Sequence, residues 1–168
     1  MNGNRMDVVC AGILVADMFV PPLDNLPKAG ELVLVDNFLL GTGGCAANAG
    51  ISLAKLGVAV SVAGKVGSDS FGIFIAEDLK KHGLADVSQI RVSQSYATSR
   101  TVILTVKGED RRFIHAIGAN ADFQVADIVL DLVSQAKVLY VGGYQIMPSI
   151  EPAALGELFS KAREKGVL

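Results

Sequence analysis

The sequence predicts an α/β fold built on a mainly parallel β-sheet, and three observations support this prediction. Short apolar runs recur at residues 7–12, 58–64 and 138–141, and such runs are typical of buried parallel strands. Segments with apolar residues at helical spacing lie between these runs. Of the 168 residues, 51% are hydrophobic and 19% are charged, which fits a globular domain with a sizeable core. The alternation predicts three layers, α/β/α.

Four segments are predicted as helices: residues 46–56, 72–82, 125–134 and 151–165. Glycine directly follows three of them, at Gly57, Gly83 and Gly166. Glycine readily adopts the left-handed conformation with which many helices end. These glycines therefore support the predicted ends of the three helices.

Two β-rich segments do not fit the alternation of strands and helices. Residues 32–40 show partial alternation of apolar residues, which is typical of a strand with one buried face. Residues 101–117 contain two β-rich runs around the turn sequence Lys107-Gly108-Glu109-Asp110, which indicates a hairpin. We expect these segments to form a small second sheet, a lid, that projects from the main domain.

The composition argues against several kinds of partner. The formal net charge is −2, so nothing favours binding to nucleic acid or to an anionic membrane. The two cysteines, Cys10 and Cys45, lack the spacing of a zinc site. The sequence shows neither a signal peptide nor an apolar run long enough to span a membrane. We therefore expect a cytoplasmic protein with free thiols and no metal site in this chain.

A glycine-rich segment combines features that suit a polyhydroxylated ligand. Gly43 and Gly44 leave the backbone open to close approach, and a helix predicted to begin near Ala46 presents unpaired N–H groups beside them. Asn48 adds two donors and an acceptor that could bind neighbouring hydroxyl groups. Asp17 follows the first predicted strand, at the edge of the sheet where α/β folds bind ligands.

Three motifs resemble the N-terminal signature of the ribokinase-like, or PfkB-type, carbohydrate kinases. They are Gly43-Gly44-x-Ala46-x-Asn48, Leu53-Ala54-x-Leu56-Gly57 and Gly64-Lys65-Val66-Gly67-x-Asp69-x-Phe71-Gly72. The matches that flank them are Gly12 with Asp17, Pro27-x-x-Gly30-Glu31 and Gly118-Ala119-Asn120. The resemblance extends over about residues 7–141, which is nearly the whole chain.

This resemblance implies a function and a set of contacts. It implies ATP-dependent phosphorylation of a hydroxyl group on a sugar or a nucleoside-like acceptor, with Mg²⁺ on the ATP phosphates. The residues that would hold the acceptor are Asp17, Gly43, Gly44 and Asn48. Asn120 would either orient the substrate or fix the lid hinge, and Gln145 is a further candidate contact. The lid would exclude water, and its strand edges could pair in a homodimer.

The same resemblance implies a chain that continues further. Residues 1–168 correspond to the N-terminal part of a single ribokinase-like domain, with lid strands at about 32–40 and 101–117. The family's second signature, a Gly-Ala-Gly-Asp-type turn with the catalytic base and the anion hole, does not occur in the sequence. Gly166-Val167-Leu168 looks like the beginning of another strand. We therefore expect no catalytic residue here and no kinase activity from this chain alone.

Two alternatives remain at this point. Gly41-x-Gly43-x-x-Ala46 fits the dinucleotide-binding fingerprint of oxidoreductases, although the following strand ends in Gly64-Lys65, where an acidic residue should meet the ribose. The chain could also be a non-catalytic sugar-binding or dimerising module of the same fold. Reading the sequence beyond residue 168 would separate this module from a kinase.

Three kinds of polar residue near these motifs have simpler explanations. Asp69 stands where it would cap the helix predicted at 72–82. Arg111 and Arg112 stand beside the predicted hairpin turn, where a solvated pair is usual. Cys45 has no neighbour that would make it a nucleophile. We assign none of them to the site.

Overall fold

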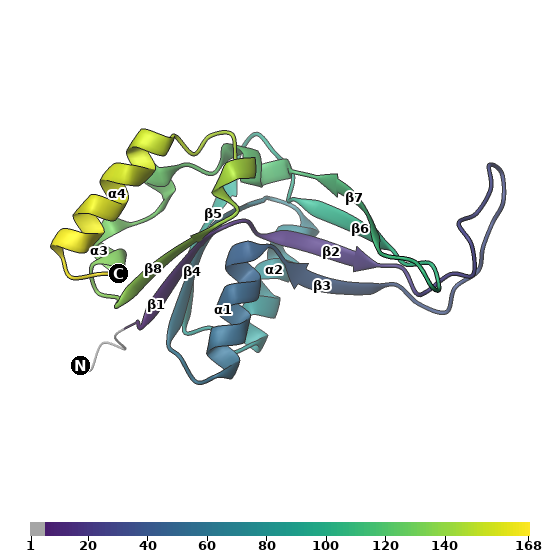
Figure 1. Ribbon diagram of the computed structural model, residues 1–168, viewed down its shortest axis with the longest axis horizontal. Coiled ribbons are helices and arrows are strands. Elements are labelled where there is room, and N and C mark those ends of the chain that lie inside the picture. The colour runs from purple at the N-terminus through teal and green to yellow at the C-terminus, as the bar shows by residue number, and fades with distance from the viewer. Residues whose placement is uncertain (1–5) are drawn as a thin grey trace.

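The computed structural model of the protein describes residues 6–168. It contains two four-stranded sheets that meet near the middle of an elongated molecule (Figure 1). The first sheet has the strand order β5-β4-β1-β8, and all its pairings are parallel. Its strands are β1 (Val8–Gly12), β4 (Val60–Gly67), β5 (Asp86–Ser93) and β8 (Val138–Gly142). The predicted α/β fold with a mainly parallel sheet is confirmed.

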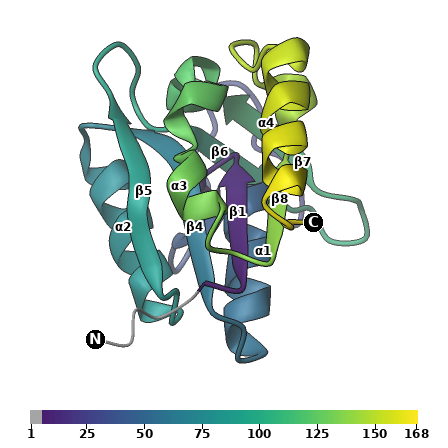
Figure 2. The ribbon, with the colours of Figure 1, turned by 90° about the vertical axis from the view of Figure 1, so that its left-hand side faces the viewer.

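Helices cover both faces of this sheet (Figure 2). One face carries α1 (Cys45–Lys55) and α2 (Ser70–Lys81), and the other carries α3 (Leu130–Val133) and α4 (Pro152–Glu164). Strand β1 is buried throughout, and its residues alternate between two cores. Val9 belongs to the core that includes Phe123, and Cys10 to the core that includes Ile75. Because both faces are covered, the strand is an unbroken apolar run.

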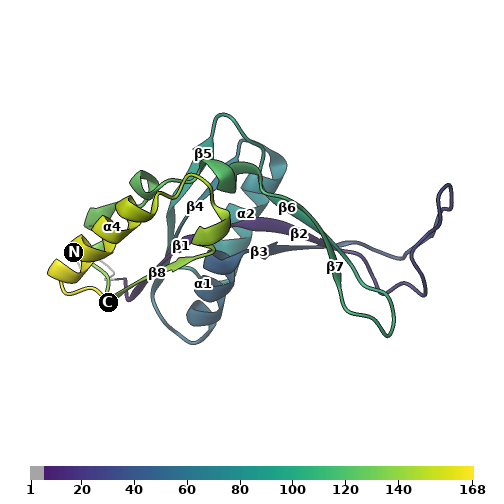
Figure 3. The ribbon, with the colours of Figure 1, turned by 45° about the horizontal axis from the view of Figure 1, so that its top comes forward.

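The second sheet projects from the end of the first (Figure 3). Its strand order is β3-β2-β6-β7. Its strands are β2 (Val15–Phe19), β3 (Leu39–Gly43), β6 (Arg100–Leu104) and β7 (Arg112–Ala116). The central pair, β2 and β6, is parallel, and the two outer pairs are antiparallel. This sheet is the expected lid, and the predicted hairpin supplies two of its strands.

Strands β2 and β5 are not predicted from the sequence, each for a physical reason. β2 begins three residues after β1 ends, so the two strands form one apolar run in the sequence. Nothing in that run indicates that the chain passes from one sheet to the other. β5 contains a polar residue that is buried by hydrogen bonding. The Gln89 side chain is 1% exposed, donates to Ser61 Oγ at 3.2 Å and accepts from the Val129 amide at 3.2 Å. An apolar pattern does not reveal such a strand.

The strand predicted at residues 32–40 is wrong in its extent. The lid strand begins only at Leu39, where pairing with Phe19 of β2 starts. The residues before it form a loop, in which Leu32 and Leu34 are 78% and 87% exposed. Their alternation therefore reflects no pairing with a neighbouring strand, and it misled the prediction.

The helix predicted at residues 125–134 is interrupted. A 3₁₀ turn, η2 (Val125–Asp127), precedes the short helix α3. The Asp127 carboxylate accepts hydrogen bonds from the Gln124 amide at 2.8 Å and from Lys65 Nζ at 3.1 Å. These contacts hold the turn against β4, and tertiary structure overrides the helical pattern.

The last residue lies alongside β8. The Leu168 amide donates to the Lys137 carbonyl oxygen at 3.0 Å, and the Leu168 carbonyl oxygen accepts from the Leu139 amide at 2.8 Å. This is the hydrogen-bond pattern with which a parallel strand begins, as predicted for residues 166–168. Within residues 6–168, the helices are all too short or too polar to cross a bilayer.

Candidate functional site

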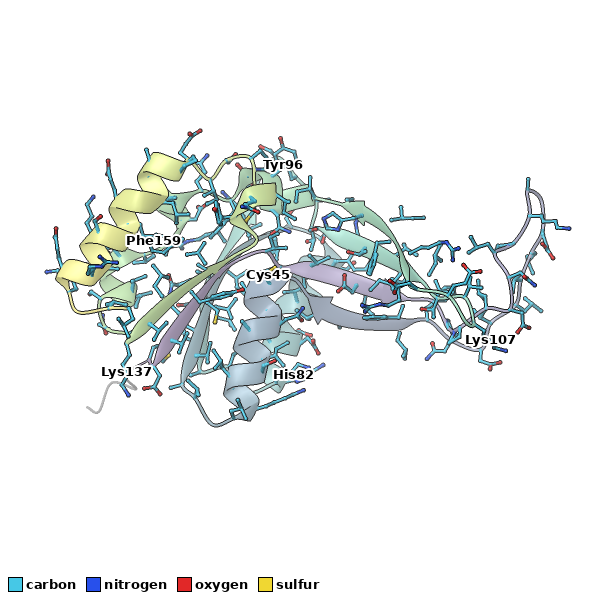
Figure 4. The ribbon with its side chains drawn as sticks, in the orientation of Figure 1. Cys45, His82, Tyr96, Lys107, Lys137 and Phe159 are labelled. Carbon is cyan, nitrogen blue, oxygen red and sulfur yellow. The ribbon has the colours of Figure 1, made fainter. Side chains whose placement is uncertain are left out.

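The candidate site lies at the junction of the two sheets, beside the beginning of α1. Figure 4 places Cys45, the first residue of α1, at this junction, and Lys107 at the far part of the lid. Strand β8 ends beside the same helix, because a β-carbon at Gly142 would lie 2.7 Å from Cys45 Cβ. The carboxyl edge of the parallel sheet, a helix N-terminus and the lid therefore converge at the junction. In α/β folds, ligands bind at this edge of the sheet.

Gly44 begins α1 in a conformation that glycine adopts far more readily than other residues. Its φ angle is 95°, and a β-carbon there would lie 2.3 Å from the carbonyl oxygen of Ile13. That oxygen accepts a hydrogen bond from the Ala46 amide at 3.3 Å. The first bond within the helix runs from the Asn48 amide to the Gly44 carbonyl oxygen at 2.9 Å, so the amides before Asn48 have no acceptor within the helix. α1 therefore begins without a side-chain cap and with its partial positive charge at the junction.

The Asp17 carboxylate lies directly against the backbone of Gly43. In the pairing of β2 with β3, Val15 opposes Gly43 and Asp17 opposes Gly41. Both glycines therefore lie on the face of the lid that carries Asp17. A β-carbon at Gly43 would lie 1.9 Å from Asp17 Oδ2. The carboxylate can occupy this place only because residue 43 has no side chain.

Two polar side chains follow Asp17 across the same face of the lid. Thr101 of β6 opposes Asp17, and His115 of β7 opposes Thr101. The Thr101 hydroxyl oxygen lies 3.0 Å from His115 Nδ1. Burial raises the pKa of Asp17, and interactions with Thr101 and His115 oppose that rise. A half-buried carboxylate of this kind is a strong acceptor for hydroxyl groups.

Asn48 and Gln145 flank the beginning of α1 from two segments. Asn48 lies in the first turn of the helix, and its side chain is exposed. Gln145 lies in η3 (Tyr144–Ile146), the short 3₁₀ helix that follows β8, and it is exposed as well. Because the end of β8 packs against Cys45, η3 lies close to the start of α1. Both side chains are available to a ligand at the junction.

Asn120 is placed differently, because it is fully buried. Its Nδ2 group donates to the Leu14 carbonyl oxygen at 2.8 Å, and its Oδ1 atom accepts from the Leu14 amide at 3.1 Å. Leu14 connects β1 to β2, which is one of the crossings between the main sheet and the lid. Of the two roles considered for Asn120, its geometry favours the lid hinge.

Asp69 caps α2, as predicted. Its Oδ1 atom accepts hydrogen bonds from the Gly72 amide at 3.0 Å and from the Thr98 hydroxyl at 2.6 Å, and its Oδ2 atom accepts from the Thr98 amide at 2.8 Å. Burial alone would raise the pKa of Asp69, but these hydrogen bonds and the charge of Arg100 outweigh it and lower the pKa. Asp69 thus stabilises the fold, and both of its carboxylate oxygens already accept hydrogen bonds.

The other polar residues considered above have local roles. Arg111 lies over the Phe113 ring, 5.5 Å from its centroid, and Arg112 forms an ion pair with Glu109. Cys45 is a free, exposed thiol, whereas burial raises the pKa of the Cys10 thiol to about 11. In the part of the chain that the structure describes, no group of three or more His, Cys, Asp or Glu side chains could hold a metal ion.

A cavity of about 820 Å³ lies away from this junction, between α2 and β5. Its lining is mainly apolar and includes Ile73, Val87 and Val92. Asp86, which also lines it, already accepts hydrogen bonds from Ser61 and Ser88. A sugar needs several free donors and acceptors, so we place the site at the junction instead.

Thr101 and His115 are site features that sequence reasoning missed. The hairpin at 101–117 was predicted, and its alternation places Thr101 and His115 on defined faces. Their alignment with Asp17 depends on the parallel pairing of β2 with β6. No local sequence signal fixes that pairing, because the two strands are far apart along the chain.

The dinucleotide-binding alternative does not fit this geometry. In that fold the glycine fingerprint follows a strand of the parallel sheet. Here Gly41 and Gly43 belong to β3, an antiparallel strand of the lid. The comparisons below also give this alternative no support.

Comparison with known proteins identifies relatives of the chain. The sequence model of the family described as "pfkB family carbohydrate kinase" matches residues 5–168. A ribokinase of Mus musculus is 31% identical over 162 residues, which cover 95% of this chain and 48% of the mouse protein. Probable fructokinase-4 of Arabidopsis thaliana is 27% identical over 171 residues, which cover 99% of this chain and 50% of the plant protein.

Solved structures share the fold. A fructokinase of Xylella fastidiosa with bound ATP superposes with a TM-score of 0.79 at 23% identity, covering 98% of this chain and 50% of that one. A ribokinase of Arabidopsis thaliana in complex with ribose and ATP gives a TM-score of 0.75 at 24% identity, covering 97% and 52%. The ribokinase-like fold is confirmed. The chain spans about half the length of these relatives.

Proposed function

Because this chain belongs to the pfkB family of carbohydrate kinases, we propose that it forms the acceptor-binding half of an enzyme that phosphorylates a small sugar. The observation that carries the proposal is the Asp17 carboxylate held against Gly43, next to the uncapped start of α1. The relatives include ribokinases and fructokinases, so D-ribose and D-fructose are the first acceptors to test.

Each part of the junction has a role in binding the acceptor. The Asp17 carboxylate accepts hydrogen bonds from two sugar hydroxyls, since an ionised carboxyl has several free lone pairs. Gly43 and Gly44 let the sugar approach the backbone, and the first-turn amides of α1 can donate to a hydroxyl oxygen. Asn48 and Gln145 add side-chain donors and acceptors. Together these groups fix the acceptor hydroxyl in one orientation, which is the main contribution that binding makes to a two-substrate reaction.

The lid contributes by excluding water from the junction. Asp17 is itself a lid residue, so a sugar bound to it lies against the lid sheet. Closing the lid over the sugar would keep water away from the phosphoryl donor and so suppress its hydrolysis. In this view Asn120, which ties Leu14 to η1 (Gly118–Asp122), sets the position of the lid relative to the main sheet.

ATP and Mg²⁺ complete the proposal for the whole enzyme. ATP supplies the phosphoryl group, and Mg²⁺ neutralises charge on its phosphates. Two structural relatives are complexes with ATP. We assign no residue of this chain to either group. The part played by residues 6–168 is to bind and orient the acceptor.

We further propose that this chain alone has no kinase activity, because it lacks the turn with the base and the anion hole. The test is an assay of ADP release from ATP with D-ribose or D-fructose, on this chain and on a form extended to the length of the relatives. The proposal predicts sugar-dependent ADP release from the longer form only. Robust release from the 168-residue chain would overturn it.

Sugar binding itself is tested by thermal denaturation against a panel of sugars and nucleosides. A ligand that binds only the folded chain raises its Tm. We expect at least one sugar to raise the Tm of the wild-type chain and to leave that of Asp17→Asn unchanged. Equal shifts for both proteins would show that Asp17 does not bind the acceptor.

We also propose that the lid mediates a homodimer. The lid and the loop before β3 carry large apolar side chains that are exposed in the single chain: Phe19, Leu26, Leu32, Val33, Leu34, Phe38, Leu39, Leu40 and Phe113. A cluster of this kind marks an interaction surface. A second copy is the partner we favour, because the exposed edges of β3 and β7 and this apolar cluster both lie on the lid and could be covered together.

A further inference from the structure

A cavity of about 350 Å³ lies on the back of the lid, the face opposite to Asp17. Side chains alternate between the two faces of a strand, so the neighbours of Asp17 and of its partner Thr101 belong to this back face. The register places six side chains there in two rows, all of which line the cavity: Ala16, Arg100 and Ala116, then Met18, Val102 and Ile114. Phe71, the second residue of α2, adds a wall from the main domain, because α2 lies beside the base of the lid (Figure 1).

The back-face side chains in this cavity are apolar except for Arg100. Met18 and Val102 are half-buried, and Ile114 is 64% exposed. The cavity therefore presents apolar surface to solvent, next to one charged group. Its size, its apolar walls and its single placed polar group are typical of sites that bind small molecules.

The Arg100 side chain is oriented by an aromatic ring and is available to a ligand. Its guanidinium lies over the Phe71 ring, 5.5 Å from the ring centroid. Stacking uses one face of the planar group and leaves the N–H groups at its edge able to donate. Within residues 6–168, the Arg100 side chain has neither a hydrogen-bond nor an ion-pair partner. Asp69 lies within electrostatic reach, but both of its oxygens already accept other hydrogen bonds.

The two faces of the lid favour different ligands. The front face carries the Asp17 carboxylate, which suits neutral hydroxyl groups and repels an anion. The back face carries an unpaired cation, and a carboxylate matches the fork of a guanidinium with two parallel hydrogen bonds. A sugar in the cavity would leave most of its hydroxyls unpaired against apolar walls. The chemistry of the back face therefore points to an apolar molecule with one carboxylate.

We propose that this cavity is a second binding site, separate from the acceptor site, for a small apolar carboxylate. The carboxylate pairs with Arg100, and the apolar body packs among Phe71, Met18 and Ile114. Because these walls belong to α2 and to the lid, a ligand bound here connects the lid to the main domain. The site does not use Asp17, so it does not depend on the proposed function.

The probe for this site is 2-naphthoate, and 2-naphthamide is the matched control with the same shape and no charge. ¹H–¹⁵N spectra recorded during titration of the chain locate each compound and give its dissociation constant. We expect naphthoate to shift the amides of residues 16–18, 71, 100–102 and 114–116 in a saturable way. It should bind about tenfold more tightly than naphthamide, the effect of hydrogen bonds to a charged group.

Two arginine variants test the role of Arg100. Arg100→Gln should weaken naphthoate binding by about tenfold and leave naphthamide binding unchanged. Arg91→Gln is the control, because it removes the same charge from an exposed position on β5, in the other sheet. It should leave both affinities unchanged. Both arginines are exposed, so both variants should fold, and their Tm values check this.

The outcomes separate this inference from the proposed function. Asp17→Asn should lose sugar binding and retain naphthoate binding. Equal affinity for naphthoate and naphthamide, equal affinities in the two arginine variants, or shifts confined to the exposed loop at residues 32–38 would overturn the inference and leave the acceptor site intact. Loss of naphthoate binding at concentrations where the chain dimerises would assign the cavity to a second copy, and would overturn it as well.

Discussion

Asp17 Oδ2 occupies the space that a β-carbon on Gly43 would fill, at a separation of only 1.9 Å. The two residues lie on neighbouring strands of the lid, so the acid and the glycine form one structural unit. Because the backbone of Gly43 cannot move without moving the start of α1, the carboxylate is positioned relative to the helix N-terminus. This unit is what connects the fold to the proposed chemistry.

Gly43→Ala should therefore disrupt the site. The new methyl group would displace the Asp17 carboxylate, and overpacking of this kind costs about 2 kcal/mol in the free energy of unfolding. Sugar affinity should fall by about tenfold or more, because the carboxylate is no longer in place. Denaturant unfolding and calorimetric titration measure the two effects.

Gly41→Ala is the matched control for this substitution. Gly41 lies on the same strand and the same face, and a β-carbon there would meet only the Phe19 ring, at 3.4 Å. We expect its stability and sugar affinity to stay close to those of the wild type. An equal loss of stability and sugar affinity in both variants would mean that the strand tolerates no side chain at either position. It would contradict a specific effect of Gly43 on the position of Asp17.

Asp17→Asn should stabilise the fold at neutral pH while it abolishes sugar binding. Burial raises the pKa of Asp17, so stability is lost as the pH rises from the unfolded-state pKa near 3.8 through the higher pKa of the folded state. A neutral amide avoids this cost, and the gain over wild type should disappear in acid, where Asp17 is protonated. Denaturant unfolding at pH 7 and at about pH 3 measures the difference.

Asp69→Asn should change the free energy of unfolding in the opposite direction in the same experiment. The pKa of Asp69 is lowered, so its ionised form stabilises the fold above the unfolded pKa of about 3.8 and that contribution is lost as the pH falls. This variant should be less stable than wild type at pH 7, with the difference shrinking in acid. If Asp17→Asn behaved in the same way, Asp17 would not be a carboxylate whose ionisation lowers the stability of the fold, and our interpretation of this residue would be wrong.

Asn120→Ala should destabilise the lid hinge. It leaves the amide and the carbonyl of Leu14 without their side-chain partner in a buried place, which costs about 3 kcal/mol in the free energy of unfolding. Asn48→Ala is the contrasting variant. Its side chain is exposed, so stability should change by less than about 0.5 kcal/mol while sugar affinity falls. A stable Asn120→Ala chain would contradict the hinge role.

The proposed dimer depends on exposed leucines in the loop before β3. A chain with both Leu32→Asp and Leu34→Asp should sediment as a monomer in analytical ultracentrifugation at concentrations where the wild type is dimeric, because charges in an apolar interface lose their hydration. Leu56→Asp is the control, since Leu56 is comparably exposed at the end of α1. A monomeric wild type, or a dimer that survives the loop substitutions, would refute the proposal.

The sequence predicts the parts of this structure that local chemistry determines. The glycine-rich entry into α1 and the cap that Asp69 provides for α2 follow from residue type and spacing. The parallel sheet follows from its unbroken apolar strands. β5 escapes prediction because Gln89 is buried by hydrogen bonds to Ser61 and Val129. The alignment of Asp17, Thr101 and His115 is not predicted, because the pairing between β2 and β6 joins segments that are distant in sequence.

The most direct test of the central claim is to locate the bound sugar by NMR. ¹H–¹⁵N spectra of the chain, recorded during titration with D-ribose and with D-fructose, report which backbone amides respond. The account predicts that at least one sugar shifts the amides around Asp17, Gly43, Gly44 and Asn48 in a saturable way. Saturable shifts confined to the cavity between α2 and β5 would contradict it, as would the absence of shifts with both sugars.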